Sequence, residues 1–232
     1  MAITPRLKDK ITQPENMSLL KAYQFNKYYE QFITYEKSDI TYMLQELGVE
    51  PIKYFKEFIP DFAYFANAHI KNVNINDNVT RIGRSAFSNS QLESVNFDNA
   101  SNLKIILNCA FERTDLKKLA LPSNVPLIAI GDYAFYECAN IQSIALPEGL
   151  SKIGKCCFDG CENASIIHLP KGVTNISAYA FRDCGYNSHS LIVYYSGTSS
   201  ELEVDAAGWH SSAFDKVTEF QCIDKFYGKL DW

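Results

Sequence analysis

Histidine is scarce in this chain, and the short motifs that identify many enzymes are missing. None of the four histidines has a partner at a spacing that would place a nucleophile, a base and an orienting group together. Neither the G-x-x-x-x-G-K loop nor the G-x-G-x-x-G turn occurs. The cysteines lack the close C-x2-C pairs of structural zinc sites. We therefore expect no enzyme, no catalytic residues, no cofactor and no metal site.

Long apolar runs are also missing. No stretch reaches the roughly 18 apolar residues that a membrane span requires. The basic first ten residues are not followed by the apolar run of a secretion signal. We therefore expect no membrane insertion and a soluble protein of the cytoplasm or another intracellular compartment. An extracellular location would require that a leader had been removed.

Basic residues are fewer than acidic residues in one part of the chain. The formal net charge is −5, and residues 1–60 hold eight basic and eight acidic residues, so the acidic surplus lies entirely beyond them. An acidic surface repels phosphate groups, which argues against a nucleic-acid partner.

The cysteine count is odd, at seven. Three of the cysteines, Cys138, Cys161 and Cys184, stand three residues after a phenylalanine, where other repeats place small residues. Three stacked cysteines cannot all pair, and a free cysteine behaves as a small hydrophobe in a core. We predict that these thiols are buried and reduced, which is typical of a reducing compartment.

A repeat occupies the middle of the chain. Phenylalanine recurs at intervals of 22 to 24 residues, at Phe65, Phe87, Phe111, Phe135, Phe158 and Phe181. Other apolar residues recur in step, such as Ile130 five residues before Phe135 and the pair Ile144 and Leu146 after it. This L-x-x-L-x-L spacing predicts one short strand per repeat and a core that forms only when repeats stack.

The repeat unit resembles a known family. The stretch from Ile130 to Cys138, followed by Ile144, Ala145, Leu146 and Pro147, resembles the BspA-type leucine-rich repeat, IG..AF..C..L..I.LP, of about 23 residues. The resemblance covers roughly residues 59–222. It implies a solenoid and a binding role, because that family is associated with adhesion and host interaction in bacteria and eukaryotic parasites.

The predicted fold class is an α+β repeat solenoid. It consists of a leucine-rich-repeat array of short parallel strands, with an N-terminal helical cap and an irregular C-terminal cap. The predicted divisions are 1–60 for an arm and the helical cap, 61–189 for the repeats, and 190–232 for a closing segment with a last shortened repeat at Ala213 and Phe214. Strands are expected near 93–97, 117–121, 142–146 and 165–169 in one sheet, beside a buried column of Phe87, Phe111, Phe135, Phe158 and Phe181.

The N-terminal region is rich in aromatic residues at helical spacing, and it has two interpretations. It covers the open hydrophobic end of the solenoid, as repeat arrays require, or it docks a partner through aromatic side chains. Tyr23, Tyr28 and Tyr35 lie toward the edges of its apolar face and are the candidate contacts.

The outward residues of the predicted strands form two columns of small and mostly uncharged side chains. Five of them are candidate partner-binding residues: Asn96, Lys118, Ser143, Ile166 and His168. Extended solenoid sheets commonly hold partners. The alternative is that the columns are only solvated.

We therefore predict a non-enzymatic recognition module that presents a leucine-rich-repeat surface for protein–protein interaction. A structural or assembly component of a phage or other particle is the alternative, and a secreted or surface adhesin follows if a leader was removed. The expected partner is a protein, with a glycan as the second ligand class, and we expect a monomer rather than a homo-oligomer.

Overall fold

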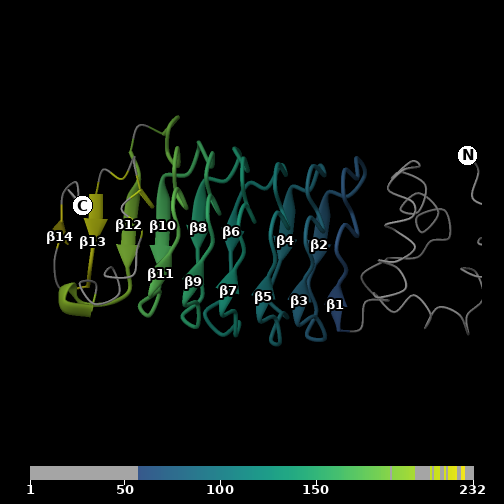
Figure 1. The fold of residues 1–232 in the computed structure, drawn as a ribbon, viewed down its shortest axis with the longest axis horizontal. Coiled ribbons are helices and arrows are strands. Elements are labelled where there is room, and N and C mark those ends of the chain that lie inside the picture. Colours follow the sequence, from purple (N-terminus) through teal and green to yellow (C-terminus); the bar gives the residue numbers. More distant parts are fainter. Residues whose placement is uncertain are drawn as a thin grey trace, which may run out of the picture.

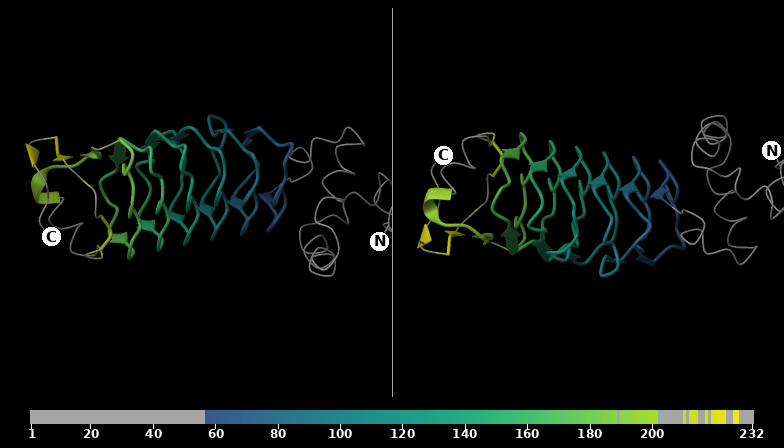
Figure 2. Two further views of the ribbon diagram at one scale, coloured as in Figure 1. Left: turned by 90° about the horizontal axis from the view of Figure 1, so that it is seen from above. Right: turned by 90° about the horizontal axis from the view of Figure 1, so that it is seen from below.

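The computed structural model describes residues 57–188, 190–201, 210, 212–214, 217, 219–223 and 226–227. These residues form an elongated solenoid in which each turn, or rung, stacks on the next along one axis (Figure 1). Seen from above and below, the rungs follow one another in sequence order from residue 57 to the C-terminal end of the array (Figure 2). Sequence-distant contacts are therefore contacts between neighbouring rungs.

Each regular rung contributes two short strands, one to each side of the solenoid. We call the first sheet the isoleucine sheet, because the second residue of every strand is a buried isoleucine. Its parallel strands are, in spatial order, β1 (Phe58–Ile59), β3 (Arg81–Ile82), β5 (Ile105–Ile106), β7 (Ala129–Ile130), β9 (Lys152–Ile153) and β11 (Asn175–Ile176).

The opposite side carries the strands that the L-x-x-L-x-L spacing predicts. We call its six-stranded part the front sheet: β6 (Leu119–Ala120), β8 (Ser143–Ala145), β10 (Ile166–Leu169), β12 (Ile192–Tyr195), β13 (Glu219–Gln221) and β14 (Phe226–Tyr227). The pair β2 (Asn72–Asn74) and β4 (Ser94–Asn96) forms a separate two-stranded sheet. The front strands are therefore confirmed, while the prediction of one continuous sheet is wrong.

A column of stacked aromatic rings runs through the core. Phe87, Phe111, Phe135, Phe158 and Phe181 are fully buried, as predicted. Successive rings lie 5.0 to 5.2 Å apart and within 11° of parallel. This spacing matches the ~4.8 Å separation of hydrogen-bonded strands, so each rung sets one ring on the next.

The first and last rings of the column are not those of the phenylalanine series in the sequence repeat. Tyr64, not Phe65, stacks on Phe87 at 5.0 Å, and Phe65 is partly exposed. At the other end Phe214, in the predicted last shortened repeat, stacks on Phe181 at 4.7 Å. With Tyr64 in place, every ring from Tyr64 to Phe181 stands five residues after a buried isoleucine of the isoleucine sheet.

The turn that carries each ring has an unusual backbone. Residues two before and two after the ring adopt positive φ, such as Tyr133 (φ 58°) and Glu137 (φ 53°) around Phe135. A left-handed residue other than glycine costs roughly 1–2 kcal/mol. The backbone N–H groups of Tyr133, Phe135 and Glu137 each donate to a carbonyl of the next rung at 2.8 Å. The next rung therefore holds this turn in its strained conformation.

Glycine is needed in these turns for close approach. A Cβ added to Gly154 would lie 2.5 Å from the backbone nitrogen of Asp132 in the preceding rung. No Cβ fits at that distance, so the side chain must be absent for the two rungs to pack. Gly83 meets the backbone of Asp61 in the same way.

The predicted cysteine column is present and buried. The thiol of Cys138 donates to the carbonyl of Phe111 at 3.0 Å, and that of Cys184 donates to Phe158 at 3.0 Å. Cys161 bonds the carbonyl of Phe135 at 3.5 Å. Each thiol thus satisfies a carbonyl of the rung before it, and all seven cysteines are free.

Helix is nearly absent from the described residues, where only 199–201 are helical. The α+β class is therefore corrected to a parallel-strand β-solenoid for this part of the chain. The N-terminal helical cap and Tyr23, Tyr28 and Tyr35 lie outside the described residues. No helix in the described part is long and apolar enough to cross a membrane.

Removing one ring from the column tests its role in stability. Phe135→Ala should lower the free energy of unfolding by about 3–5 kcal/mol, because it leaves a cavity between two stacked rings. Ile128→Ala is the matched control, since Ile128 is 55% exposed and its truncation should change stability by less than about 0.5 kcal/mol. Chemical denaturation measures both, and equal effects of the two changes would contradict the column.

Alkylation of the native protein tests the cysteine column. Burial raises the pKa of Cys138 and Cys161, so iodoacetamide should modify them, and Cys184, only after denaturation. Cys109 is partly exposed, and burial raises its pKa to about 11. Because the thiolate is the reactive form, labelling of Cys109 should accelerate as the pH rises toward that value. Mass spectrometry reads the order of labelling, and a pair that resists alkylation in denaturant without reductant would indicate a disulfide.

Candidate binding surface

The exposed side of the front strands forms a flat face, which we call the sheet face. Its residues are those that alternate with the buried ones in β2, β4, β6, β8, β10 and β12. Within each of the two sheets the strand register aligns them into two columns. One column includes Asn74 opposite Asn96 and then Ala120, Ala145, His168 and Tyr194; the other includes Asn72 opposite Ser94 and then Ser143, Ile166 and Ile192.

The face is interrupted between β4 and β6. At the neighbouring junctions a backbone N–H bonds the next strand, from Ile75 to Asn96 at 2.9 Å and from Leu121 to Ala145 at 3.0 Å. Among the described residues, no equivalent bond joins Phe97 to Ala120. A bond from Lys117 N–H to Glu93 O, at 3.2 Å, still crosses the junction. The two sheets are therefore separated at the Phe97 end of the β4–β6 junction, and they remain bonded at the Lys117 end.

A bulky side chain stands beside the interruption. Phe97 is buried at the position where the rungs on either side place Ile75 and Leu121. Its ring packs edge-on against Phe111, with centroids 6.5 Å apart. We attribute the parting to this ring, which takes more room between the rungs than an aliphatic side chain. Val95 consequently stays partly exposed, whereas its counterparts Val73 and Leu119 are buried.

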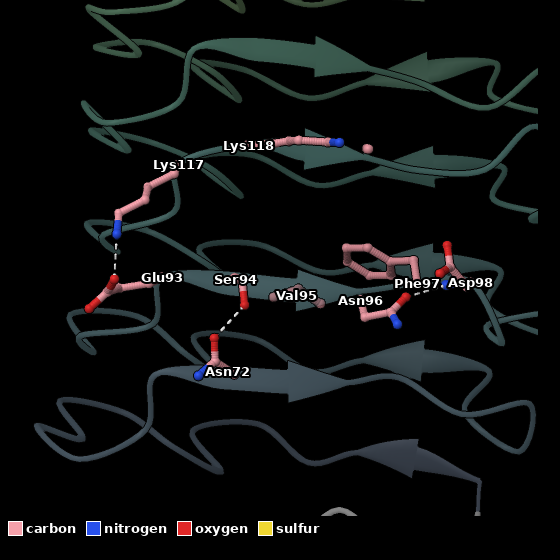
Figure 3. A pocket seen from close by; sticks show the side chains of 10 residues that line it. Asn72, Glu93, Ser94, Val95, Asn96, Phe97, Asp98, Lys117 and Lys118 are labelled. Carbon is pink, nitrogen blue, oxygen red and sulfur yellow. Dashed lines mark hydrogen bonds and ion pairs between the residues drawn. The ribbon is translucent and has the colours of Figure 1, made fainter.

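A shallow depression of about 430 Å³ lies at this interruption (Figure 3). It includes two of the predicted binding residues, Asn96 and Lys118. The residues that line it are Asn72, Glu93, Ser94, Val95, Asn96, Phe97, Asp98, Lys117, Lys118 and Ala120. Lys118 precedes β6 and so is not part of a strand, although it contributes to the same depression as the strand residues.

Four charged residues line the depression, and two of them, Glu93 and Lys117, are paired with each other, while Asp98 and Lys118 form no ion pair within the described part of the chain. Glu93 lies between two lysines, with its carboxylate 2.6 Å from Lys117 Nζ and 3.3 Å from Lys71 Nζ. The hydrogen bond from Lys117, followed by that from Lys71, lowers the pKa of Glu93. The same bond raises the pKa of Lys117. Glu93 is therefore ionised and its charge is neutralised by its neighbours.

Lys118 is different. It makes no ion pair or hydrogen bond with any residue in the described part of the chain. Figure 3 shows Lys117 reaching across to Glu93, while Lys118 lies along its own strand. Lys118 therefore offers an uncompensated positive charge at this edge of the depression.

The amide side chains on the other edge have donors to spare. Asn72 Oδ1 accepts a bond from Ser94 Oγ at 2.6 Å, and Asn96 Oδ1 accepts one from the backbone of Asp98 at 2.8 Å. These bonds fix the orientation of both amides. The Nδ2 groups donate to no described residue, so they are available to a ligand.

Farther along the face, His168 is exposed and stacks on Tyr194. Their ring centroids lie 5.3 Å apart and their planes differ by 16°. The sequence predicts His168 on this face but not Tyr194, which falls in the predicted closing segment, 190–232. The register of β10 with β12, His168 opposite Tyr194, places the tyrosine in the same column. Ser143 and Ile166 lie opposite each other in the adjacent column and are partly exposed.

The described residues contain no group of three or more His, Cys, Asp or Glu side chains that could hold a metal ion. The surface groups above are an ammonium, amide donors and stacked rings. Such groups serve to recognise a ligand by hydrogen bonds, charge and stacking.

Comparison with solved structures finds leucine-rich repeat proteins. The structure of a leucine-rich repeat protein from T. pallidum has a TM-score of 0.52 and 24% identity, over 57% of this chain and 59% of that chain. One from Bacteroides ovatus has a TM-score of 0.43 and 22% identity, over 62% and 44%. A leucine-rich cell surface protein from Faecalibacterium prausnitzii has a TM-score of 0.28 and 18% identity, over 58% and 62%. These matches span less than two thirds of each solved chain and concern the fold alone.

No curated protein matches the chain significantly. The family model described as BspA type leucine-rich repeat region matches residues 57–187 in six copies. That range contains the whole ring column from Tyr64 to Phe181. The chain therefore belongs to the BspA-type leucine-rich repeat family.

Proposed function

We propose that this chain is a non-enzymatic recognition module that binds another protein through the sheet face. Membership of a leucine-rich-repeat family supports a binding role in general terms. The observation that carries the proposal is the depression between β4 and β6. It combines an unpaired ammonium, spare amide donors and the partly exposed Val95 on a face that is otherwise flat.

A protein is the partner class that these groups favour. Protein interfaces place apolar contact and hydrogen bonds side by side within a patch that is low in charge. The sheet face has that composition, because it presents Ala120, Ala145 and Ile166 together with the polar Asn96 and Ser143. The acidic surplus of the chain disfavours nucleic acid. We propose that the chain acts as a monomer toward this partner, which leaves the face open.

Site-specific photocrosslinking tests where the partner binds. A photoreactive phenylalanine analogue at position 118 should crosslink a partner from the native source, because Lys118 borders the depression. The same analogue at position 152 is the matched control, since Lys152 is an exposed lysine of β9 on the isoleucine sheet. The crosslinked band, identified by mass spectrometry, should appear for position 118 and not for position 152.

The aromatic N-terminal region is the competing location. A third analogue at position 28, in place of Tyr28, examines it in the same experiment. Crosslinking from position 28 alone would contradict binding through the sheet face and favour the N-terminal region. Lys118→Glu should weaken capture of the partner, whereas Lys152→Glu should leave it unchanged.

A further inference from the structure

His168 has unequal neighbours in its column. On one side the register of β10 with β12 sets it against Tyr194, whose ring stacks on it at 5.3 Å. On the other side the register with β8 sets it against Ala145, which has only a methyl group. No other ring contact is made by His168 within the described residues. The imidazole face above Ala145 is therefore uncovered.

The uncovered face borders a strip of small side chains on the sheet face, Ala145 and then Ala120, which we call the slot. Ala120 follows Ala145 in the same column, so two adjacent rungs carry small side chains there. Adjacent strands lie about 4.8 Å apart, so the two alanine rungs extend about 10 Å along the solenoid. The His168 ring bounds it at one end, and at the other end it opens into the depression that Ala120 and Asn96 both line.

The end of the slot next to His168 can take one more ring in the stack. Stacked aromatic pairs prefer centroid separations of about 4.5–7 Å. A ring above Ala145 would lie one rung, about 4.8 Å, from His168, which falls in that range. The His168 and Tyr194 pair already shows that rings stand on this face at the rung spacing.

The positive charge of Lys118 indicates a second feature of the ligand, an acidic group. Lys118 lies two residues before Ala120 along the strand direction, a distance of about 7 Å. Its flexible stem can bring the ammonium toward the slot, and it has no ion-pair partner in the described part of the chain. An acidic group next to the bound ring would complement it.

We propose that the partner protein inserts an aromatic side chain into this slot, stacked on His168 above Ala145, and pairs an adjacent Asp or Glu with Lys118. The inference rests on the proposed function and specifies the chemistry of the partner's binding segment. The segment is an aromatic residue with an acidic residue beside it. Tyr194 is a positioning residue, because it supports the imidazole from behind.

A sugar fits the slot less well. Sugar hydroxyls need several hydrogen-bonding groups when they are desolvated. The floor here consists of the methyl groups of Ala120 and Ala145, and the adjacent column beside Ala145 and His168 offers a single hydroxyl, that of Ser143, next to Ile166. An aromatic side chain replaces water on such a floor without leaving polar groups unpaired.

Short peptides test the slot without knowledge of the partner. The full chain is titrated with N-acetyl-Trp-Glu-amide while NMR follows the ring protons of His168. We expect an upfield ring-current shift that saturates. N-acetyl-Leu-Glu-amide should cause no such shift, and N-acetyl-Trp-Gln-amide should bind about two- to fivefold more weakly, since an exposed ion pair contributes that much.

Three variants distinguish binding in the slot from binding elsewhere on the chain. Ala145→Leu fills the slot and should abolish the shift, while Ala129→Leu makes the same change on the exposed side of β7 in the isoleucine sheet and should preserve it. Lys118→Gln should remove the difference between the Glu and Gln peptides. Circular dichroism and melting temperature confirm that each variant remains folded.

The outcomes that overturn the proposal are specific. Shifts of equal size with the Trp and Leu peptides, or an undiminished shift in Ala145→Leu, would exclude stacking in the slot. A response to methyl β-glucoside but to no peptide would assign the slot to a glycan. Because the peptides report on the slot directly, a failed peptide titration with successful crosslinking at position 118 refutes this inference alone.

Discussion

Stacking at a fixed rung distance is the constraint on which this structure depends. Strands that bond to each other lie about 4.8 Å apart, and aromatic rings that stack face to face tolerate nearly the same separation. The seven rings from Tyr64 to Phe214 meet both requirements at once, with centroids 4.7 to 5.2 Å apart. A rung whose strand and ring separations no longer agreed would lose its core contact and its hydrogen bonds to the next strand together.

The same constraint explains why the interruption of the front sheet stays local. Between the rungs of β4 and β6 the strands part, yet Phe87, Phe111 and Phe135 remain stacked at 5.1 and 5.0 Å. The isoleucine sheet also continues there, with Ile105 in register with Ala129. The opening therefore belongs to one face, and the array can carry an irregular surface without a break in its core.

The sequence predicts the features that follow from periodicity and misses those that follow from size or local geometry. The ring column, the front strands and the cysteine column all recur with the repeat. The two-residue strands of the isoleucine sheet are too short for alternation to reveal them. Tyr64 stands beside Phe65, and composition alone does not decide which ring turns inward.

The features of the candidate site also divide into those that periodicity predicts and those that it does not. Asn96 and His168 were placed by alternation and lie on the sheet face. The depression itself depends on the volume of Phe97, which periodicity treats as equivalent to Ile75 or Leu121. Tyr194 was missed because the longer connection after Phe181 breaks the period that would have aligned it with His168.

Each ring from Tyr64 to Phe181 stands five residues after a buried isoleucine, so insertions are not found in this segment of the rung. The step from a front-strand residue to the next isoleucine varies, from nine residues between Val73 and Ile82 to eleven between Val95 and Ile106. Connections that are not bound to the column accept extra residues at small entropic cost. The family can therefore lengthen one side of a rung and reshape the surface there, while the turn that carries the ring keeps a single length.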